Sequence, residues 1–76
     1  MPHVNVCMYP GRTDEQKRAL TAKIIQAFDE ALDIPSKWLT VAIEEVAQEH
    51  WHAEVVEPEI LGKQALRYKE PEYLDD

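Results

Sequence analysis

The sequence predicts a small α/β protein built on one β-α-β unit with parallel strands, followed by a short C-terminal helix. Three observations carry this prediction: side chains alternate over residues 2–9, a capped helical pattern covers residues 13–32, and alternation returns over residues 38–46. A long crossover helix between two strands favours parallel pairing in a right-handed unit. With 76 residues, the chain is expected to form a single domain over residues 1–76.

The first strand is predicted where apolar residues occupy every second position. Val4, Val6 and Met8 share one face of it, and His3, Asn5, Cys7 and Tyr9 share the other. Pro10 and Gly11 then end the strand, because this dipeptide marks a turn. Pro2 suits the start of a strand, where its missing N–H costs least.

The helix predicted over residues 13–32 has the clearest local signature. Thr13 and Gln16 have the spacing of a capping box, in which each side chain accepts a hydrogen bond from the other residue's backbone N–H. Apolar residues then recur at helical spacing and form one stripe: Leu20, Ile24, Ala27, Phe28, Ala31 and Leu32. Pro35 ends the helix, because the residue before a proline is pushed out of the helical region.

The second strand is predicted over residues 38–46. Leu39, Val41 and Ile43 share one face of it, and Trp38, Thr40 and Ala42 share the other. Beyond it, residues 58–68 are predicted to form a short helix with Pro58 in its first turn, although Gly62 is a poor helix former. The acidic C-terminal end is expected to form a tail.

A β-α-β unit of this size is too small to be stable alone, so a further source of stability is expected. Small domains use disulfides, a metal or oligomerisation. Cys7 is the one cysteine, which excludes an internal disulfide, and His3, His50 and His52 lack a recognised zinc spacing. Two strands and one helix also leave two sheet edges and one sheet face bare. We therefore expect self-association to complete the sheet, and no metal site.

The charge balance narrows the classes of partner. The net charge is −7, from 15 acidic and 8 basic residues, and the basic residues form no cluster. Such a chain is a poor candidate for binding nucleic acid or an anionic membrane, although one pocket can still be locally positive and take a small anion. No apolar run approaches the roughly 18 residues of a membrane span. The N-terminus also lacks a signal-peptide layout, so a cytoplasmic protein is expected.

Four features in register resemble the 4-oxalocrotonate tautomerase family. Pro2 follows the initiator Met, Gly11-Arg12 follows the first strand, residues 13–17 open the helix, and Trp51 follows the second strand. The resemblance implies a cofactor-independent tautomerase that interconverts keto and enol forms of a small carboxylate. The substrate class would be 2-oxo or 2-hydroxy-dienoic acids, or phenylpyruvate-like acids.

The stretch after Trp51 resembles a longer-tailed branch of the same family. It is similar to small enterobacterial paralogues that form dimers rather than hexamers. The glycine-rich hairpin of the hexameric members is also missing, because His52-Ala53-Glu54 occupies its place. The resemblance therefore favours a homodimer over a hexamer.

The resemblance makes Pro2 the general base and acid, once Met1 is removed and the proline nitrogen becomes a secondary amine. A proton shuttle works best when its pKa lies near the working pH. An α-amino group starts at about 7.7–8.0, proline's amine is somewhat higher, and desolvation or a nearby cation lowers the pKa. Arg12 is the implied cation, which would bind the substrate carboxylate and stabilise enolate charge.

Trp51 and Thr40 are the candidate substrate-binding residues. Trp51 would line an apolar pocket and help to exclude water, or it would anchor the core or an interface, as buried tryptophans commonly do. Thr40 stands where the family pattern has a second arginine, and this departure weighs against a diacid substrate. Lys37 or Arg67, from this subunit or a neighbouring one, are the candidates to replace that arginine. Trp38 is expected to serve packing or an interface.

Two other functions stay open at this point. The same Pro2 amine, in its protonated form, could hydrate or dehalogenate a 3-halo or acetylenic acid. The chain could also be a catalytically silent dimer that binds a small molecule, which the missing second arginine favours. Cys7 is interpreted as a small buried side chain, because the sequence shows no base to activate it.

Overall fold

The computed structural model describes residues 1–75 and divides the chain into two compact units, Met1–Glu45 and Val46–Asp76. The first unit contains both strands and the long helix, and the second unit is helical. The expectation of one domain over the whole chain stays a prediction. No helix among the described residues is both long enough and apolar enough to cross a membrane.

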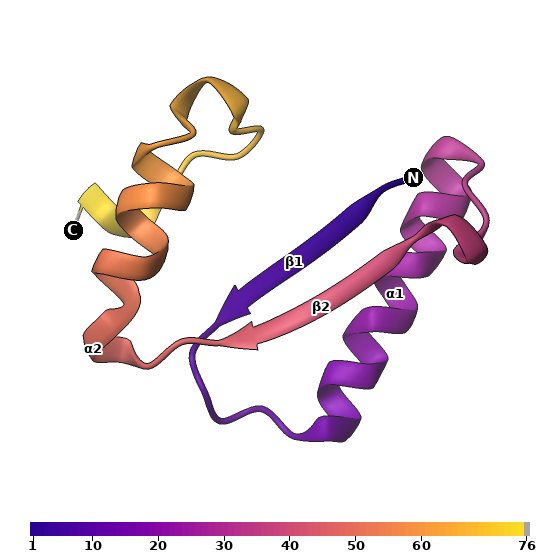
Figure 1. Ribbon diagram of the computed structural model, residues 1–76, viewed down its shortest axis with the longest axis horizontal. Coiled ribbons are helices and arrows are strands. Elements are labelled where there is room, and N and C mark those ends of the chain that lie inside the picture. Colours follow the sequence, from indigo (N-terminus) through magenta and orange to yellow (C-terminus); the bar gives the residue numbers. More distant parts are fainter. Residues whose placement is uncertain (76) are drawn as a thin grey trace. The chain divides into compact units, whose positions relative to one another are not determined.

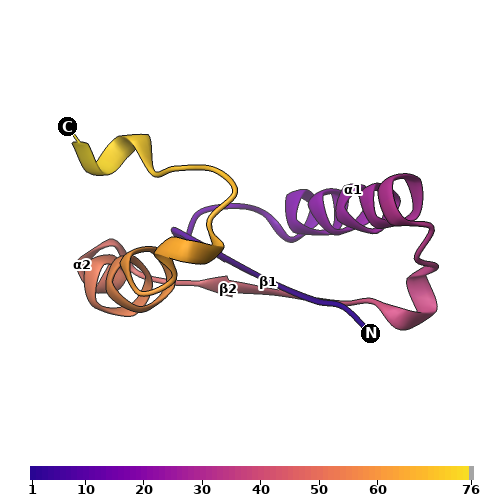
Figure 2. The same ribbon diagram turned by 90° about the horizontal axis from the view of Figure 1, so that it is seen from above.

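The first unit is the predicted β-α-β unit. Strand β1 (His3–Met8) leads into helix α1 (Asp14–Leu32), and strand β2 (Thr40–Glu45) follows (Figure 1). The strands are parallel neighbours whose register runs from His3 opposite Thr40 to Met8 opposite Glu45. Helix α1 lies over one face of this two-stranded sheet (Figure 2). The predicted fold class, a β-α-β unit with parallel strands, is therefore confirmed.

Helix α1 begins and ends where its capping residues place it. The Thr13 side chain accepts from the Gln16 N–H at 3.0 Å, and the Gln16 side chain accepts from the Thr13 N–H at 3.0 Å. These bonds satisfy two of the N–H groups that a helix start leaves without partners. At the other end Asp33 adopts the left-handed conformation, with φ 56°, and donates to Asp29 O at 3.0 Å. The predicted capping box is confirmed.

The second strand starts later than predicted, because a tight turn precedes it. Residues Ser36–Trp38 form one turn of 3₁₀-helix, closed by the Trp38 N–H on Pro35 O and the Leu39 N–H on Ser36 O, each at 3.1 Å. Pro35 favours such a turn through its fixed φ. The placement of Trp38 on a strand face was therefore wrong, and its side chain is 46% exposed.

The helix of the second unit lies upstream of its predicted position. Helix α2 (Gln48–Trp51) continues directly into a wider π-helical segment (His52–Leu61), so Pro58 lies inside the helix and not in its first turn. A widened turn gives the proline ring room that an α-helical turn does not. Gly62 ends the segment, and its N–H donates to Glu57 O at 2.9 Å. The prediction of a helix over residues 58–68 was wrong in its bounds.

Few side chains are fully buried in this protomer. The buried apolar residues among those described are Val46, Val55 and Val56, all in the second unit. Helix α1 has no fully buried residue, and its stripe residues Leu20 and Leu32 are 36% and 61% exposed. Within residues 1–75, each strand of the sheet also pairs with one other strand only. The sheet is thus left open, as expected for a sheet that oligomerisation completes.

Candidate active site

Pro2 lies at the start of β1 and is fixed against the start of β2. Its carbonyl oxygen accepts a hydrogen bond from the Thr40 N–H at 3.2 Å. Pro2 is half-buried, whereas Met1 is 94% exposed and projects into solvent. The backbone of Pro2 is therefore held at one end of the sheet. Met1, whose peptide bond blocks the proline nitrogen, is exposed to solvent.

Thr40 pairs with a histidine that sequence reasoning did not assign to the site. The Nδ1 atom of His3 and Oγ1 of Thr40 are 2.6 Å apart and share a hydrogen bond across the sheet. The pairing follows from register, because His3 is directly opposite Thr40. Knowing the register of the parallel strands would have been enough to find it.

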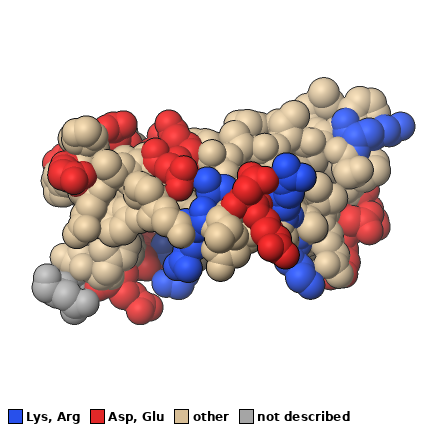
Figure 3. All heavy atoms as spheres, turned by 90° about the horizontal axis from the view of Figure 1, so that it is seen from below, with Lys and Arg blue, Asp and Glu red and all other residues tan. Residues whose placement is uncertain are grey.

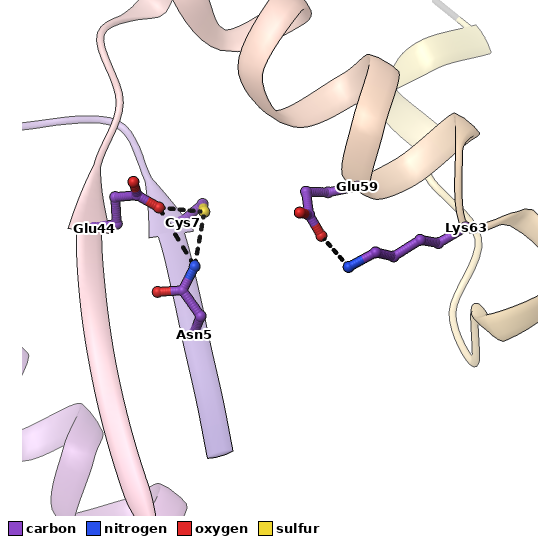
Figure 4. Close-up of polar contacts among 5 residues, drawn as sticks. All are labelled: Asn5, Cys7, Glu44, Glu59 and Lys63. Atoms are coloured by element: carbon purple, nitrogen blue, oxygen red, sulfur yellow. Dashed lines mark hydrogen bonds and ion pairs between the residues drawn. The ribbon is translucent and has the colours of Figure 1, made fainter.

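A second polar group lies on the same face of the sheet. Asn5 and Cys7 of β1 and Glu44 of β2 point toward one another (Figure 4). Glu44 Oε2 lies 3.3 Å from Asn5 Nδ2 and accepts from the Cys7 thiol at 3.4 Å. Cys7 is half-buried and not a fully buried packing residue, which corrects the sequence interpretation. The strand register brings Glu44 close to Cys7, because the two residues are directly opposite each other.

Arg12 lies at the opposite end of the sheet from Pro2. It belongs to the loop that leads from the end of β1 to the start of α1, and it lines a cavity of about 270 Å³ together with Met8, Gln16, Lys17 and Leu20. The six residue steps from Pro2 to Met8 span about 20 Å of extended strand. One protomer therefore does not bring Pro2 and Arg12 together.

Trp51 is the last residue of α2 and belongs to the second unit. Its side chain is half-buried, and its indole N–H donates to the Tyr73 hydroxyl at 3.2 Å. The nearby imidazoles pair with carboxylates of the same unit, His50 with Glu54 at 3.6 Å and His52 with Glu57 at 3.0 Å. Among the described residues, no group of three or more His, Cys, Asp or Glu side chains is placed to hold a metal ion.

Arg67, one candidate for the missing arginine, makes contacts within the second unit. Its guanidinium donates to the Glu70 carboxylate at 2.8 Å and to Ile60 O at 3.4 Å, and its side chain is 16% exposed. It lines a cavity of about 480 Å³ that Tyr73 also lines. Its charge is thus already matched by a neighbouring carboxylate.

The surface charges do not form one basic region on the face drawn in Figure 3. Lysine and arginine side chains there are interspersed with aspartate and glutamate side chains. This pattern agrees with the acidic net charge of −7.

Comparison with known proteins shows that this chain is similar to members of one enzyme family. A sequence model of the tautomerase enzyme family matches residues 2–62. The chain is 38% identical over 63 residues to a 2-hydroxymuconate tautomerase of Pseudomonas putida, which covers 83% of this chain and 100% of that protein. It is 36% identical over 74 residues to tautomerase PptA of an Enterobacter strain, which covers 96% of this chain and 97% of the relative.

A solved structure agrees with the sequence matches. It comes from a characterisation of 4-oxalocrotonate tautomerase isozymes from Methylibium petroleiphilum and is 40% identical to this chain. The two superpose with a TM-score of 0.62, over 66% of this chain and 81% of the other.

Proposed function

The chain belongs to the tautomerase family, and on that premise we propose that Pro2, freed by removal of Met1, is its general base and acid. Family membership makes the protein an isomerase. The observation that carries the proposal is the position of Pro2: it is fixed beside Thr40 at the start of the sheet, and Met1 is 94% exposed. The match to the family also begins at residue 2.

The proposed reaction needs one proton to move between two positions of the substrate. The neutral Pro2 nitrogen takes the proton of an enol hydroxyl, and the negative charge spreads through the conjugated enolate. The protonated proline then returns the proton to carbon, which gives the keto form. A cation near the enolate oxygen lowers the barrier, because it stabilises the charge that develops in the transition state.

We assign that cation to Arg12 from a second copy of the chain. Within one protomer the strand from Pro2 to Met8, about 20 Å long, separates Pro2 from the loop that carries Arg12. The open edges of the sheet, together with the exposed Leu20 and Leu32 of α1, give a second copy surfaces on which to pack. A site shared between copies follows if packing places the Arg12 cavity of one copy beside Pro2 of the other.

The substrate class we propose is a 2-hydroxy-dienoic or phenylpyruvate-like carboxylate. The similarity to a 2-hydroxymuconate tautomerase supports the first of these. We assign Thr40 to substrate contact, which its hydrogen bond with His3 at the Pro2 end supports, and we assign Trp51 to an apolar wall of the pocket. The assembly we propose is a homodimer, since residues 52–54 lack the glycines of the hexameric pattern. The location we propose is the cytoplasm.

The test compares wild type with Pro2→Ala, using the ketonisation of phenylenolpyruvate and of 2-hydroxymuconate. Pro2→Ala replaces the rigid secondary amine with a flexible primary amine, which is expected to lower kcat by about 10²-fold, the lower end of the range for a positioned base. Lys23→Met, on the exposed middle of α1, is the control for a substitution away from the proposed site. Equal rates for wild type and Pro2→Ala would overturn the catalytic role.

The direction of the pH dependence tests the protonation state of Pro2. A neutral proline base loses activity as the pH falls and the amine becomes protonated. The hydratase or dehalogenase alternative needs a protonated proline, so its activity would fall as the pH rises.

A further inference from the structure

Lys37 and Trp38 lie at the same end of the first unit as Pro2. Their 3₁₀ turn ends at Trp38, two residues before Thr40, whose N–H donates to Pro2 O at 3.2 Å. Figures 1 and 2 both show the N-terminus beside this turn between α1 and β2. The three chain steps from Lys37 to Thr40 span at most about 11 Å, and the flexible lysine stem adds further reach.

The turn presents one cation and one aromatic face together. Lys37 Nζ lies 4.9 Å from the centroid of the Trp38 ring, within cation–π range. The turn itself is closed by two backbone hydrogen bonds, so both side chains start from a fixed backbone. Among the described residues, no carboxylate forms an ion pair with Lys37. A flat conjugated carboxylate matches this pair, because its charge suits the ammonium and its carbon chain suits the indole.

The other lysine and arginine side chains of the first unit do not lie at the end of the sheet where Pro2 lies. Arg12, Lys17 and Arg18 lie before α1 or in its first turns, at the opposite end of the sheet, and Lys23 lies in the middle of α1. Lys17 and Arg18 are also paired, with Glu45 at 3.1 Å and Asp14 at 2.8 Å. Lys37 is therefore the cation that this unit itself places at the Pro2 end, among its described residues.

We propose that Lys37, held over Trp38, binds the second carboxylate of a dicarboxylate substrate at the Pro2 site and so determines specificity for diacids. This inference rests on the proposed function. Thr40 carries no charge and is bonded to His3, so it does not bind a carboxylate by an ion pair. Lys37 reaches the same end of the sheet from the preceding turn.

The experiment measures kcat and KM for 2-hydroxymuconate, a dicarboxylate, and for phenylenolpyruvate, a monocarboxylate. Wild type is compared with Lys37→Met, Lys37→Arg and Lys23→Met, and Pro2→Ala reports on the proposed function. Lys37→Met is expected to raise KM for the dicarboxylate about tenfold with kcat little changed, since an exposed charge-assisted contact of this kind mainly supports binding. The KM for phenylenolpyruvate should stay within about twofold, and Lys37→Arg should restore the diacid KM.

The outcomes separate this inference from the proposed function. Equal rises in KM for both substrates, or the same rise in Lys23→Met, would overturn the role of Lys37. So would a wild type that turns over phenylenolpyruvate in a Pro2-dependent way but does not turn over the diacid, a result that leaves the role of Pro2 in place. A wild type inactive on both substrates would overturn the proposed function, and the inference with it.

Discussion

Combining Pro2→Ala and Arg12→Ala chains in one oligomer tests whether each site draws on two copies. Each variant alone is expected to lose most activity, because every site lacks either the proline or the arginine. In one protomer Pro2 precedes β1 and Arg12 follows it, and the six residue steps from Pro2 to Met8 alone span about 20 Å. If a site takes Pro2 from one copy and Arg12 from another, a mixed oligomer contains some sites with neither lesion.

The expected recovery follows from random mixing of equal amounts of the two chains. A site is intact when its proline comes from an Arg12→Ala chain and its arginine comes from a Pro2→Ala chain. With equal amounts of the two chains, each of these conditions is met with a probability of about one half. About one quarter of all sites should then be intact in any symmetric assembly with this arrangement. Mixing wild type with Pro2→Ala should leave about one half of the sites intact under the same rule.

The assay is the ketonisation of phenylenolpyruvate after co-expression of the two chains from one plasmid. Native mass spectrometry would confirm that mixed oligomers have formed in the expected proportions. Activity near one quarter of wild type supports the shared site. Activity no higher than that of the single variants, in a sample shown to contain mixed oligomers, would refute the assignment of Arg12 to a neighbouring copy.

The remaining predictions concern the helix caps and the N-terminus. Thr13→Ala should lower the free energy of unfolding by about 1 kcal/mol, while Thr13→Ser should match wild type in urea denaturation. Gly62→Ala should cost about 1–3 kcal/mol, since its Cβ would lie 2.6 Å from Pro58 O; a fully stable variant would contradict this contact, and Ala65→Ser is the exposed control. Protein that retains Met1, as checked by intact mass, should be inactive because its proline nitrogen is an amide, whereas a C-terminal tag should have no effect.

The β-α-β unit could be predicted because its signals are local. Thr13 and Gln16 lie in one turn and specify the start of α1, and alternation in each strand marks the face that packs on the helix. The errors lie where backbone geometry overrides such signals. Trp38 fits the alternation but is held in a 3₁₀ turn after Pro35. Pro58 resembles a helix start, yet it sits within a widened helix that an α-helical pattern does not describe.

The candidate site could be predicted residue by residue but not as an arrangement. The resemblance singled out Pro2 and Arg12, and the predicted strand that lies between them is confirmed as β1. The pairing of His3 with Thr40 depends on the register of two strands that lie 37 residues apart in the chain. The sequence left Lys37 and Arg67 as equal candidates to replace the missing arginine, and the structure distinguishes them, because Lys37 lies in the turn before β2 and Arg67 is paired with Glu70.

Stability and catalysis in this protein should depend on the same contacts between copies. No residue of the first unit, all of which is described, is fully buried, so its half-buried apolar side chains have surface left that further contacts could cover. Leu20 and Leu32 of α1 and the sheet edges are stabilised if a second copy covers them, and that copy is also the proposed source of Arg12. Dilution should therefore lower activity per chain and thermal stability together, as mass action requires for a folded oligomer. A protein that dissociates on dilution, by sedimentation velocity, while it keeps full activity per chain would separate the two and contradict a shared site.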